Sequence, residues 1–240
     1  MSEVVIIALT NMRNGNLCVG AVELNSLQML RLSPSYNPET KQAHYRQPSQ
    51  FALGQVWDIT YVPRWNLLPP HMEDVNVLQS HLQGTMTDLG CWVRKHAERI
   101  RVHTGGPSGL LDGILKFSPL SHGQYARSAY LSRNADRYGT QSLCLWIPDQ
   151  TLIYEKHDRG GMPEHRFSYI ATHPGHSSVR LKYSGIEASP LSISANTLLS
   201  VSLARWWSPP DDPERMEQCT LQLCNVLSRP STTDGFLHNS

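Results

Sequence analysis

The sequence lacks several features that define large classes of proteins. Its 240 residues carry 21 Lys and Arg against 20 Asp and Glu, so there is no excess of one charge of the kind that coats a polyanion. Only 17% of the residues are charged and 40% are hydrophobic, which is enough for buried cores and argues against a disordered chain. Any contact with nucleic acid must therefore come from a local basic patch.

Long apolar runs and paired cysteines are also missing. No run reaches the roughly 18–20 residues that cross a bilayer, so we expect no membrane association. The apolar N-terminal stretch is short and carries an acidic Glu3 where a signal peptide has basic residues, which favours a first β-strand. The five cysteines are odd in number and scattered, unlike a disulfide framework. These absences predict a cytoplasmic protein.

The sequence contains none of the stronger catalytic motifs. It has no Walker-type phosphate loop, dinucleotide-binding glycine motif, His-Glu-x-x-His or Gly-x-Ser-x-Gly. Cys219 and Cys224 lie five apart on a predicted strand and so face opposite sides, while His173 and His176 have ligand-like spacing but no Cys-x-x-Cys beside them. We expect a binding protein and not an enzyme, without a cofactor or a metal site.

Short alternating segments dominate the chain. Residues 4–10 form an apolar segment, Asn14-Gly15 is a strong turn signal, and two further strands follow at 17–24 and 28–32. Three strands joined by tight turns are how a small five-stranded barrel begins. Further strands are predicted at 54–62, 142–147, 151–154, 166–171, 179–183, 198–204 and 220–227, and one helix at 87–100. The fold class is mostly β with one or two helices.

Breaks in this pattern suggest a division of the chain. A polar stretch at 33–50 has no apolar periodicity and reads as a long loop. The sequence His-Thr-Gly-Gly-Pro-Ser-Gly at 103–109 is the best candidate for a domain boundary. We predict a first barrel with an inserted loop and helix at 1–104, a second barrel at 105–229 and a flexible tail at 230–240. Pro148-Asp149-Gln150 predicts a hairpin between the strands on either side of it.

The string Pro69-Pro70-His71-Met72-Glu73-Asp74 is the most distinctive local motif. His71, Glu73 and Asp74 could bind a metal or act as acid and base groups. Alternatively, the prolines fix an extended entry and the two carboxylates sit where a helix N-terminus or a buried turn favours negative charge. We favour the structural interpretation.

Arginine and aromatic residues gather in three parts of the chain. Proteins that bind single strands stack bases on exposed aromatic rings while Arg and Lys follow the phosphates. Two adjacent strand residues cannot both face one core, so one indole of Trp206-Trp207 should lie outside it. The nucleic-acid-binding candidates are Arg31, Arg64, Trp65, Arg127, Tyr130, Arg133, Arg137, Arg205 and Trp206.

In this order, the segments resemble the dual OB-containing domain family of prokaryotic proteins. The segments that carry the resemblance are Thr10-Asn11-Met12-Arg13, 18–22, 30–32, 54–59, 69–75, 200–205 and 219–223. The sequence departs from the pattern at Leu30, where an aromatic residue commonly precedes the Arg, and at Trp206-Trp207, which replace a Pro. The resemblance implies two consecutive OB-like five-stranded barrels and nucleic-acid binding, as an accessory component of an antiviral or mobile-element system.

Three functions remain open at this point. The first is a non-enzymatic module that binds single-stranded DNA or RNA. The second is a scaffold subunit that docks a nuclease or a helicase, which the near-zero net charge and the Pro-rich loops support. The third is a small-ligand sensor or an enzyme that uses His71, Glu73 and Asp74.

Overall fold

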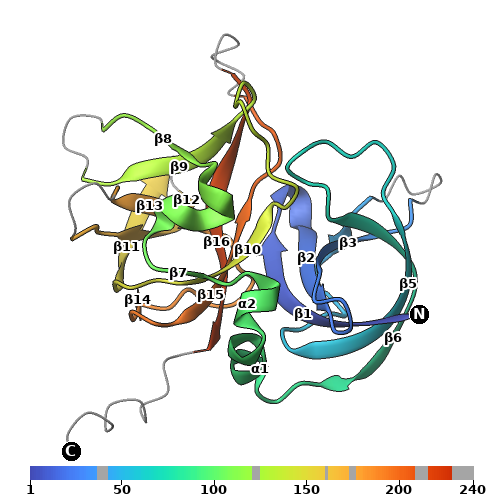
Figure 1. Ribbon diagram of the computed structural model, residues 1–240. Helices are drawn as coiled ribbons and strands as arrows, with labels where there is room; N and C mark the ends of the chain where they lie inside the picture. The colour runs from blue at the N-terminus through green and yellow to red at the C-terminus, as the bar shows by residue number, and fades with distance from the viewer. Residues whose placement is uncertain (37–42, 121–124, 160–161, 173–176, 209–215, 229–240) are drawn as a thin grey trace, which may run out of the picture.

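The computed structural model of the chain describes residues 1–36, 43–120, 125–159, 162–172, 177–208 and 216–228 (Figure 1). It contains two β-barrels that lie side by side, with two short helices at one end of the boundary between them. The fold is mostly β, as the sequence predicts. Among the described residues, no helix combines the length and the apolar character that crossing a bilayer requires.

The first barrel is a closed sheet of five strands with the connectivity of an OB fold. Its strands are β1 (Ser2–Asn11), β2 (Asn16–Glu23), β3 (Met29–Pro34), β5 (Gln55–Pro63) and β6 (Asp74–Thr85). They pair in the order β1-β2-β3-β6-β5 and back to β1. The β3–β6 pair is parallel and the others are antiparallel. A short strand β4 (Tyr45–Arg46) pairs with β2.

The second sheet repeats this order, with two consecutive strands in the first position. Its strands are β10 (Leu143–Ile147), β11 (Leu152–Arg159), β12 (Met162–Tyr169), β13 (Val179–Tyr183), β15 (Leu198–Leu203) and β16 (Gln218–Ser228). Strand β11 pairs with β12 and β10 with β15, so together they serve as the first strand. Strands β13 and β16 are parallel, as β3 and β6 are in the first barrel. The prediction of two consecutive OB-like barrels is confirmed.

Smaller elements complete the second sheet and the boundary. They are α1 (Leu89–Lys95), α2 (Ala97–Ile100), β7 (His103–Thr104), the 3-10 segment η2 (Pro107–Gly113), β8 (Lys116–Phe117), β9 (Arg127–Ser132) and β14 (Ser192–Ile193). Strand β9 lies between β13 and β16 at one end of the sheet. The single helix predicted at 87–100 is divided into two at His96.

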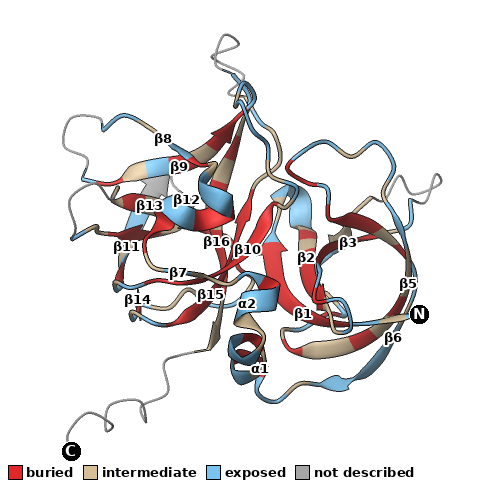
Figure 2. Cartoon of the chain, viewed as in Figure 1, coloured by how far each residue is buried: buried red, intermediate tan, exposed pale blue. Residues whose placement is uncertain are grey.

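A shared apolar core joins the two barrels. It contains the outward-facing residues of β1 to β3, the buried face of α1 and the outward-facing residues of β10, β15 and β16. Figure 2 shows these strands as buried where the barrels meet. Its buried members from the first barrel are Val5, Ile7, Ala8, Val22, Leu27 and Met29, and those from the second are Leu143, Leu145, Ile147, Leu198 and Cys224. The outer face of β2 and β3 is therefore covered.

The predicted hairpin at 148–150 is wrong. Strands β10 and β11 follow one another in the sequence but pair with different partners, β15 and β12. The segment between them joins the two strands that share the first position of the sheet. The boundary at 104/105 stays a prediction, although β7, which ends at Thr104, pairs with β10 of the second sheet. The tail at 230–240 lies outside the described residues, as do His173 and His176.

Candidate nucleic-acid interface

The loop between β5 and β6 fastens the first barrel to the second. It contains the 69–74 string, and His71, Glu73 and Asp74 are all buried. The corresponding loop of the second barrel follows β15 and begins at Ala204. These two loops meet, because the indole Nε1 of Trp206 donates a hydrogen bond to the carbonyl oxygen of Pro69 at 2.9 Å. The interface thus joins equivalent parts of two OB barrels.

Arg31 is buried beneath this loop contact. Its Nη1 lies 3.1 Å from His71 Nδ1 and its Nη2 donates to the carbonyl oxygen of Leu203 at 3.3 Å. A guanidinium has no acceptor, so Nδ1 must accept and the neutral ring of His71 carries its proton on Nε2. Burial, together with the charges of Arg31 and Arg205, lowers the pKa of His71 to about 2. His71 is therefore neutral at any physiological pH.

The two carboxylates of the loop hold the second barrel. Glu73 Oε1 accepts hydrogen bonds from the backbone N–H of Ser142, at 2.9 Å, and from its hydroxyl. Asp74 Oδ2 accepts from Arg205 Nη2 at 2.6 Å and lies 3.8 Å from Arg64 Nη1. Burial opposes the charge of Arg31, but nearby acidic groups, Glu73 and Asp74 among them, raise its pKa above the ordinary value. These contacts are those of a structural junction.

Cys219 completes the inner part of the junction without adding reactivity. Its Sγ lies 3.8 Å from His71 Nε2. Burial raises the pKa of this thiol to about 12, even though Arg31 and Arg205 act in the opposite direction. A protonated, buried thiol is a poor nucleophile and a poor metal ligand. The described residues contain no group of three or more His, Cys, Asp or Glu that could hold a metal ion.

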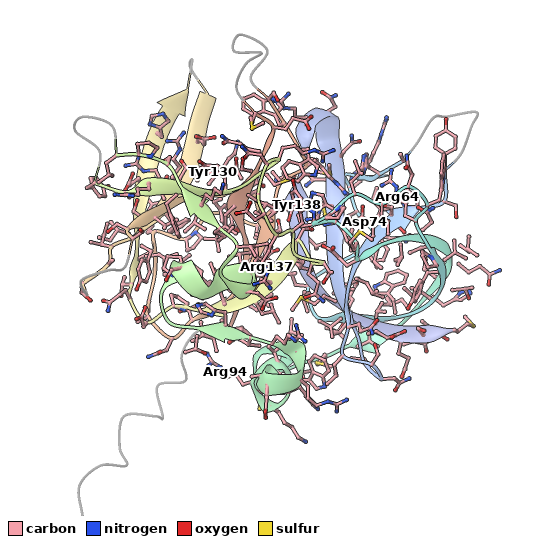
Figure 3. The ribbon with its side chains drawn as sticks, turned by 45° about the horizontal axis from the view of Figure 1, so that its top comes forward. Arg64, Asp74, Arg94, Tyr130, Arg137 and Tyr138 are labelled. Atoms are coloured by element: carbon pink, nitrogen blue, oxygen red, sulfur yellow. The ribbon has the colours of Figure 1, made fainter. Side chains whose placement is uncertain are left out.

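Above the junction, arginines from both barrels reach the surface. We define the seam surface as Arg64, Arg133, Arg137, Tyr138, Arg205 and Trp206. Arg133 lies over the ring of Trp206 at 5.0 Å, and Tyr138 meets the same ring edge-on with centroids 6.1 Å apart. Figure 3 shows Arg137 and Tyr138 on one side of the boundary and Arg64 and Asp74 on the other.

The seam surface carries more positive than negative charge. Asp74 is shared between Arg64 and Arg205, and Arg133 pairs with Glu217 at 3.7 Å. Within the described chain, no carboxylate forms an ion pair with Arg137. Four guanidinium groups therefore meet three carboxylates, counting the exposed Asp136 next to Arg137. Such a local excess is what a near-neutral protein needs to attract a phosphate backbone.

The pKa of a nearby histidine reflects this excess. Burial lowers the pKa of His44, and the positive charges of Arg205 and Arg64 lower it further, while Asp74 opposes them. His44 precedes β4 of the first barrel, whereas Arg205 follows β15 of the second. Arginines of both barrels thus lie close enough to one imidazole to affect its pKa.

The structure brings together five of the nine predicted nucleic-acid-binding residues: Arg64, Arg133, Arg137, Arg205 and Trp206. Trp65 follows Arg64 and is 82% exposed. Arg31 lies in the same region but is buried and occupied by internal contacts, so it is not part of the seam surface. Arg127 and Tyr130 are half-buried on β9, and Figure 3 shows Tyr130 on the second barrel to the left of the boundary.

Sequence reasoning missed several residues of the site. Tyr138 directly follows Arg137, which was predicted, so its position in the sequence could have identified it. Ser142 and Cys219 had no signal, because their contacts with Glu73 and His71 span 69 and 148 residues.

A second basic surface lies on β12 and β13, the strand positions that OB folds commonly use for ligands. Its cations are largely neutralised within the sheet. The guanidinium of Arg166 and the ammonium of Lys182 both contact Glu164, the latter at 2.9 Å, and Arg180 pairs with Glu155 at 2.9 Å. In the first barrel, the equivalent face of β2 and β3 is buried. The seam surface is the better candidate.

The strand order and the pairing of the two loops define a protein of two OB barrels in tandem. The chain belongs to the dual OB-containing domain family, whose pattern matches residues 2–219. No curated protein shows significant similarity to it. One solved structure, described as a murine DNA binding protein bound with ds DNA, aligns with 93% of this chain and 98% of its own at 10% identity and a TM-score of 0.28. A likeness this low carries no functional argument.

Proposed function

We propose that the protein binds single-stranded nucleic acid, DNA or RNA, along the seam surface, as a binding module without a catalytic step. The observation that carries the proposal is the convergence of arginines from both barrels above a junction that fixes their spacing. Guanidinium groups would contact phosphates, and such contacts supply most of the sequence-independent affinity.

Exposed rings beside these arginines favour a single strand over a duplex. Tyr138 is 40% exposed and Trp207 is 41% exposed. Unpaired bases can stack on such rings, whereas the bases of a duplex are already stacked on one another. The side chains that fasten the junction, Arg31, His71 and Glu73, would act only by holding the two halves of the surface in place.

Fluorescence anisotropy with labelled single strands tests this proposal. We expect the double variant Arg133→Ala/Arg137→Ala to bind at least about 10-fold more weakly. The slope of log K against log salt concentration should become shallower by roughly 0.7 for each phosphate of the single strand that the variant no longer neutralises. The matched control is Lys95→Ala/Arg99→Ala, which removes two exposed cations from α1 and α2, at the opposite end of the boundary (Figure 1).

Two results would contradict the proposal. One is an equal reduction of affinity in the control and in the seam variant, which would point to a diffuse field. The other is no binding by the wild-type protein at low salt and micromolar concentration. In that case, a partner that co-purifies from native extract and survives nuclease treatment would favour the scaffold function.

A further inference from the structure

A pocket of about 290 Å³ adjoins the seam surface on the first barrel. Its walls include Tyr36, Arg64, Trp65, Asn66 and Asn76. It shares Arg64 with the seam surface, so the pocket and the arginines of the boundary are contiguous. Its volume is at the lower end of the range for small-molecule sites. It suits a single base with part of its sugar and not a stack of bases.

The walls come from three segments that backbone hydrogen bonds hold together. Ser35, next to Tyr36, donates from its backbone N–H, at 3.2 Å, and from its hydroxyl, at 2.9 Å, to the carbonyl oxygen of Val77. The backbone N–H of Arg64 donates to the carbonyl oxygen of Asp74 at 3.1 Å. Asn66 adopts φ 62°, a left-handed conformation that asparagine tolerates in tight turns. The pocket is thus built on the barrel strands.

The aromatic walls present faces that the fold does not use. Trp65 is 82% exposed and Tyr36 is 59% exposed. Among the described residues, neither ring packs against another aromatic ring. Of the six tryptophans, Trp65 and Trp207 are the two whose side chains are exposed. Two open π-faces beside a cation match the stacking sites of single-strand binders.

Two polar side chains of the walls, those of Asn66 and Asn76, are likewise unpaired among the described residues. Within the part of the chain that the structure describes, no side chain or backbone group hydrogen-bonds the amide side chains of Asn66 and Asn76. Each amide offers both an acceptor and a donor, which is the combination needed to pair with the polar edge of a base. Arg64, 32% exposed and 3.8 Å from Asp74, keeps donors free for a phosphate.

We propose that this pocket holds one unpaired nucleobase, stacked on Trp65, with its polar edge toward the two asparagines and the adjacent phosphate on Arg64. The proposal rests on the strand binding proposed above and adds to it a position at which one base is read. A free nucleoside monophosphate presents the same chemistry, so it is the second source to be distinguished.

Binding of single strands by Trp65→Ala measures the stacking contribution. Because the indole is exposed, the variant should keep the wild-type melting temperature. We expect affinity to fall by roughly 5- to 150-fold, typical of one stacked base, and to recover for the most part in Trp65→Phe. The matched control, Leu68→Ala, removes a side chain of the same β5–β6 loop that is 51% exposed and lines neither the pocket nor the seam surface, and it should leave the affinity unchanged.

An oligonucleotide with one 2-aminopurine at successive positions provides the direct readout. At the position that enters the pocket, its fluorescence should be quenched by the wild-type protein and not by Trp65→Ala. An abasic nucleotide at that position should weaken wild-type binding and leave binding by Trp65→Ala unchanged. Asn76→Ala should alter the ranking of the four bases there and should not alter affinity for the abasic strand.

The outcomes separate this inference from the function it rests on. Salt-dependent binding that Arg133→Ala/Arg137→Ala weakens and Trp65→Ala does not would overturn the pocket and keep the seam. No salt-dependent binding in any variant would overturn both, unless adenosine, guanosine, cytidine or uridine monophosphate quenches the tryptophan fluorescence of the wild type and not that of Trp65→Ala. In that case the base pocket stands, and its ligand is the free nucleotide.

Discussion

Arg31 shows how a residue that resembles a ligand-binding group can serve the fold. On an isolated barrel, an arginine on the outer face of β3 would lie on the surface that OB folds commonly use. Here it is 5% exposed and contacts His71 and Leu203. A buried charge is tolerated only when it is paired and hydrogen-bonded, which the loop provides. The sequence shows the arginine but not the second barrel that covers it.

The buried imidazole of His71 leads to a prediction about acid stability. In the unfolded chain His71 takes up a proton near its ordinary pKa of 6.5, but the folded chain does not do so until about pH 2. Below pH 6.5 the unfolded state therefore binds one proton more, and the free energy of unfolding falls by up to about 1.4 kcal/mol per pH unit. His71→Gln removes this contribution and keeps an acceptor for Arg31.

Urea denaturation at pH 7 and pH 5 checks this expectation. Between these two values, wild type should lose roughly 2 kcal/mol more stability than His71→Gln does. The carboxylates that titrate near pH 5 are common to both proteins and cancel in the comparison. His81→Gln replaces an exposed histidine of β6 and should lose as much as wild type. Equal decreases in all three proteins would show that His71 becomes protonated while the chain is folded.

At the scale of elements, the sequence predicts strands better than their partners. Asn14-Gly15 gives a hairpin because both residues adopt positive φ, 61° and 69°, and the flanking strands β1 and β2 pair directly. Pro148-Asp149-Gln150 carries a comparable turn signal, but its flanking strands pair elsewhere. Local composition fixes where the chain turns, and the neighbours of each strand are decided by barrel closure.

The sequence pattern does not predict strand β6, because apolar and polar residues do not alternate regularly along it. Its pairing with β5 contains two register shifts, and Leu78 and Leu82 are about half exposed on it. A bulge changes which side chains face the core, so the period of two that identifies a strand disappears. Because the sequence pattern misses β6, it provides no strand to pair with the parallel edge of β3. A closed first barrel is therefore predicted only from the family resemblance.

The segment after β13 provides a test of how closely the chain packs against β16 beside the boundary. Gly185 forms a bridge with Thr10 of β1, and a Cβ at this position would collide with the carbonyl oxygen of Cys224. Gly185→Ala should therefore destabilise the protein by about 1–3 kcal/mol, as overpacking does. Gly84→Ala on β6 is the control, since a Cβ there meets nothing within 4 Å. Chemical denaturation of both variants measures the difference, and a neutral Gly185→Ala would show that this segment can move away from β16 without cost.

For the whole molecule, the docked face determines which surface remains for a ligand. Barrel 1 buries the outside of β1 to β3 against β10, β15 and β16, so its strand face is closed and its β5–β6 loop meets the β15–β16 loop. The seam surface exists only because of this docking. A resemblance to OB proteins could predict two barrels, but not that Asp74 and Arg205, which are 131 residues apart in the sequence, would share one site.

The shared core also predicts that the two barrels unfold together. Leu143 of β10 is 2% exposed and packs beside Gly20 and Ala8 of the first barrel. Leu143→Ala should cost about 2–5 kcal/mol. Because the cavity lies between the barrels, both should be destabilised equally and melt in one transition. If each barrel were stable alone, Leu143→Ala would instead lower the stability of the second barrel only.

Fluorine NMR of 5-fluorotryptophan-labelled protein can separate these cases, since Trp57 lies in the core of the first barrel and Trp146 in that of the second. In urea, the folded resonances of both should disappear with one midpoint, and Leu143→Ala should lower that midpoint equally for the two. Leu191→Ala removes a side chain that is 84% exposed and should leave the stability within about 0.5 kcal/mol of wild type. If Leu143→Ala lowered the urea midpoint of Trp146 and left that of Trp57 unchanged, the barrels would fold independently. The seam surface depends on the docking of the two barrels, so it would then be lost before either barrel unfolds.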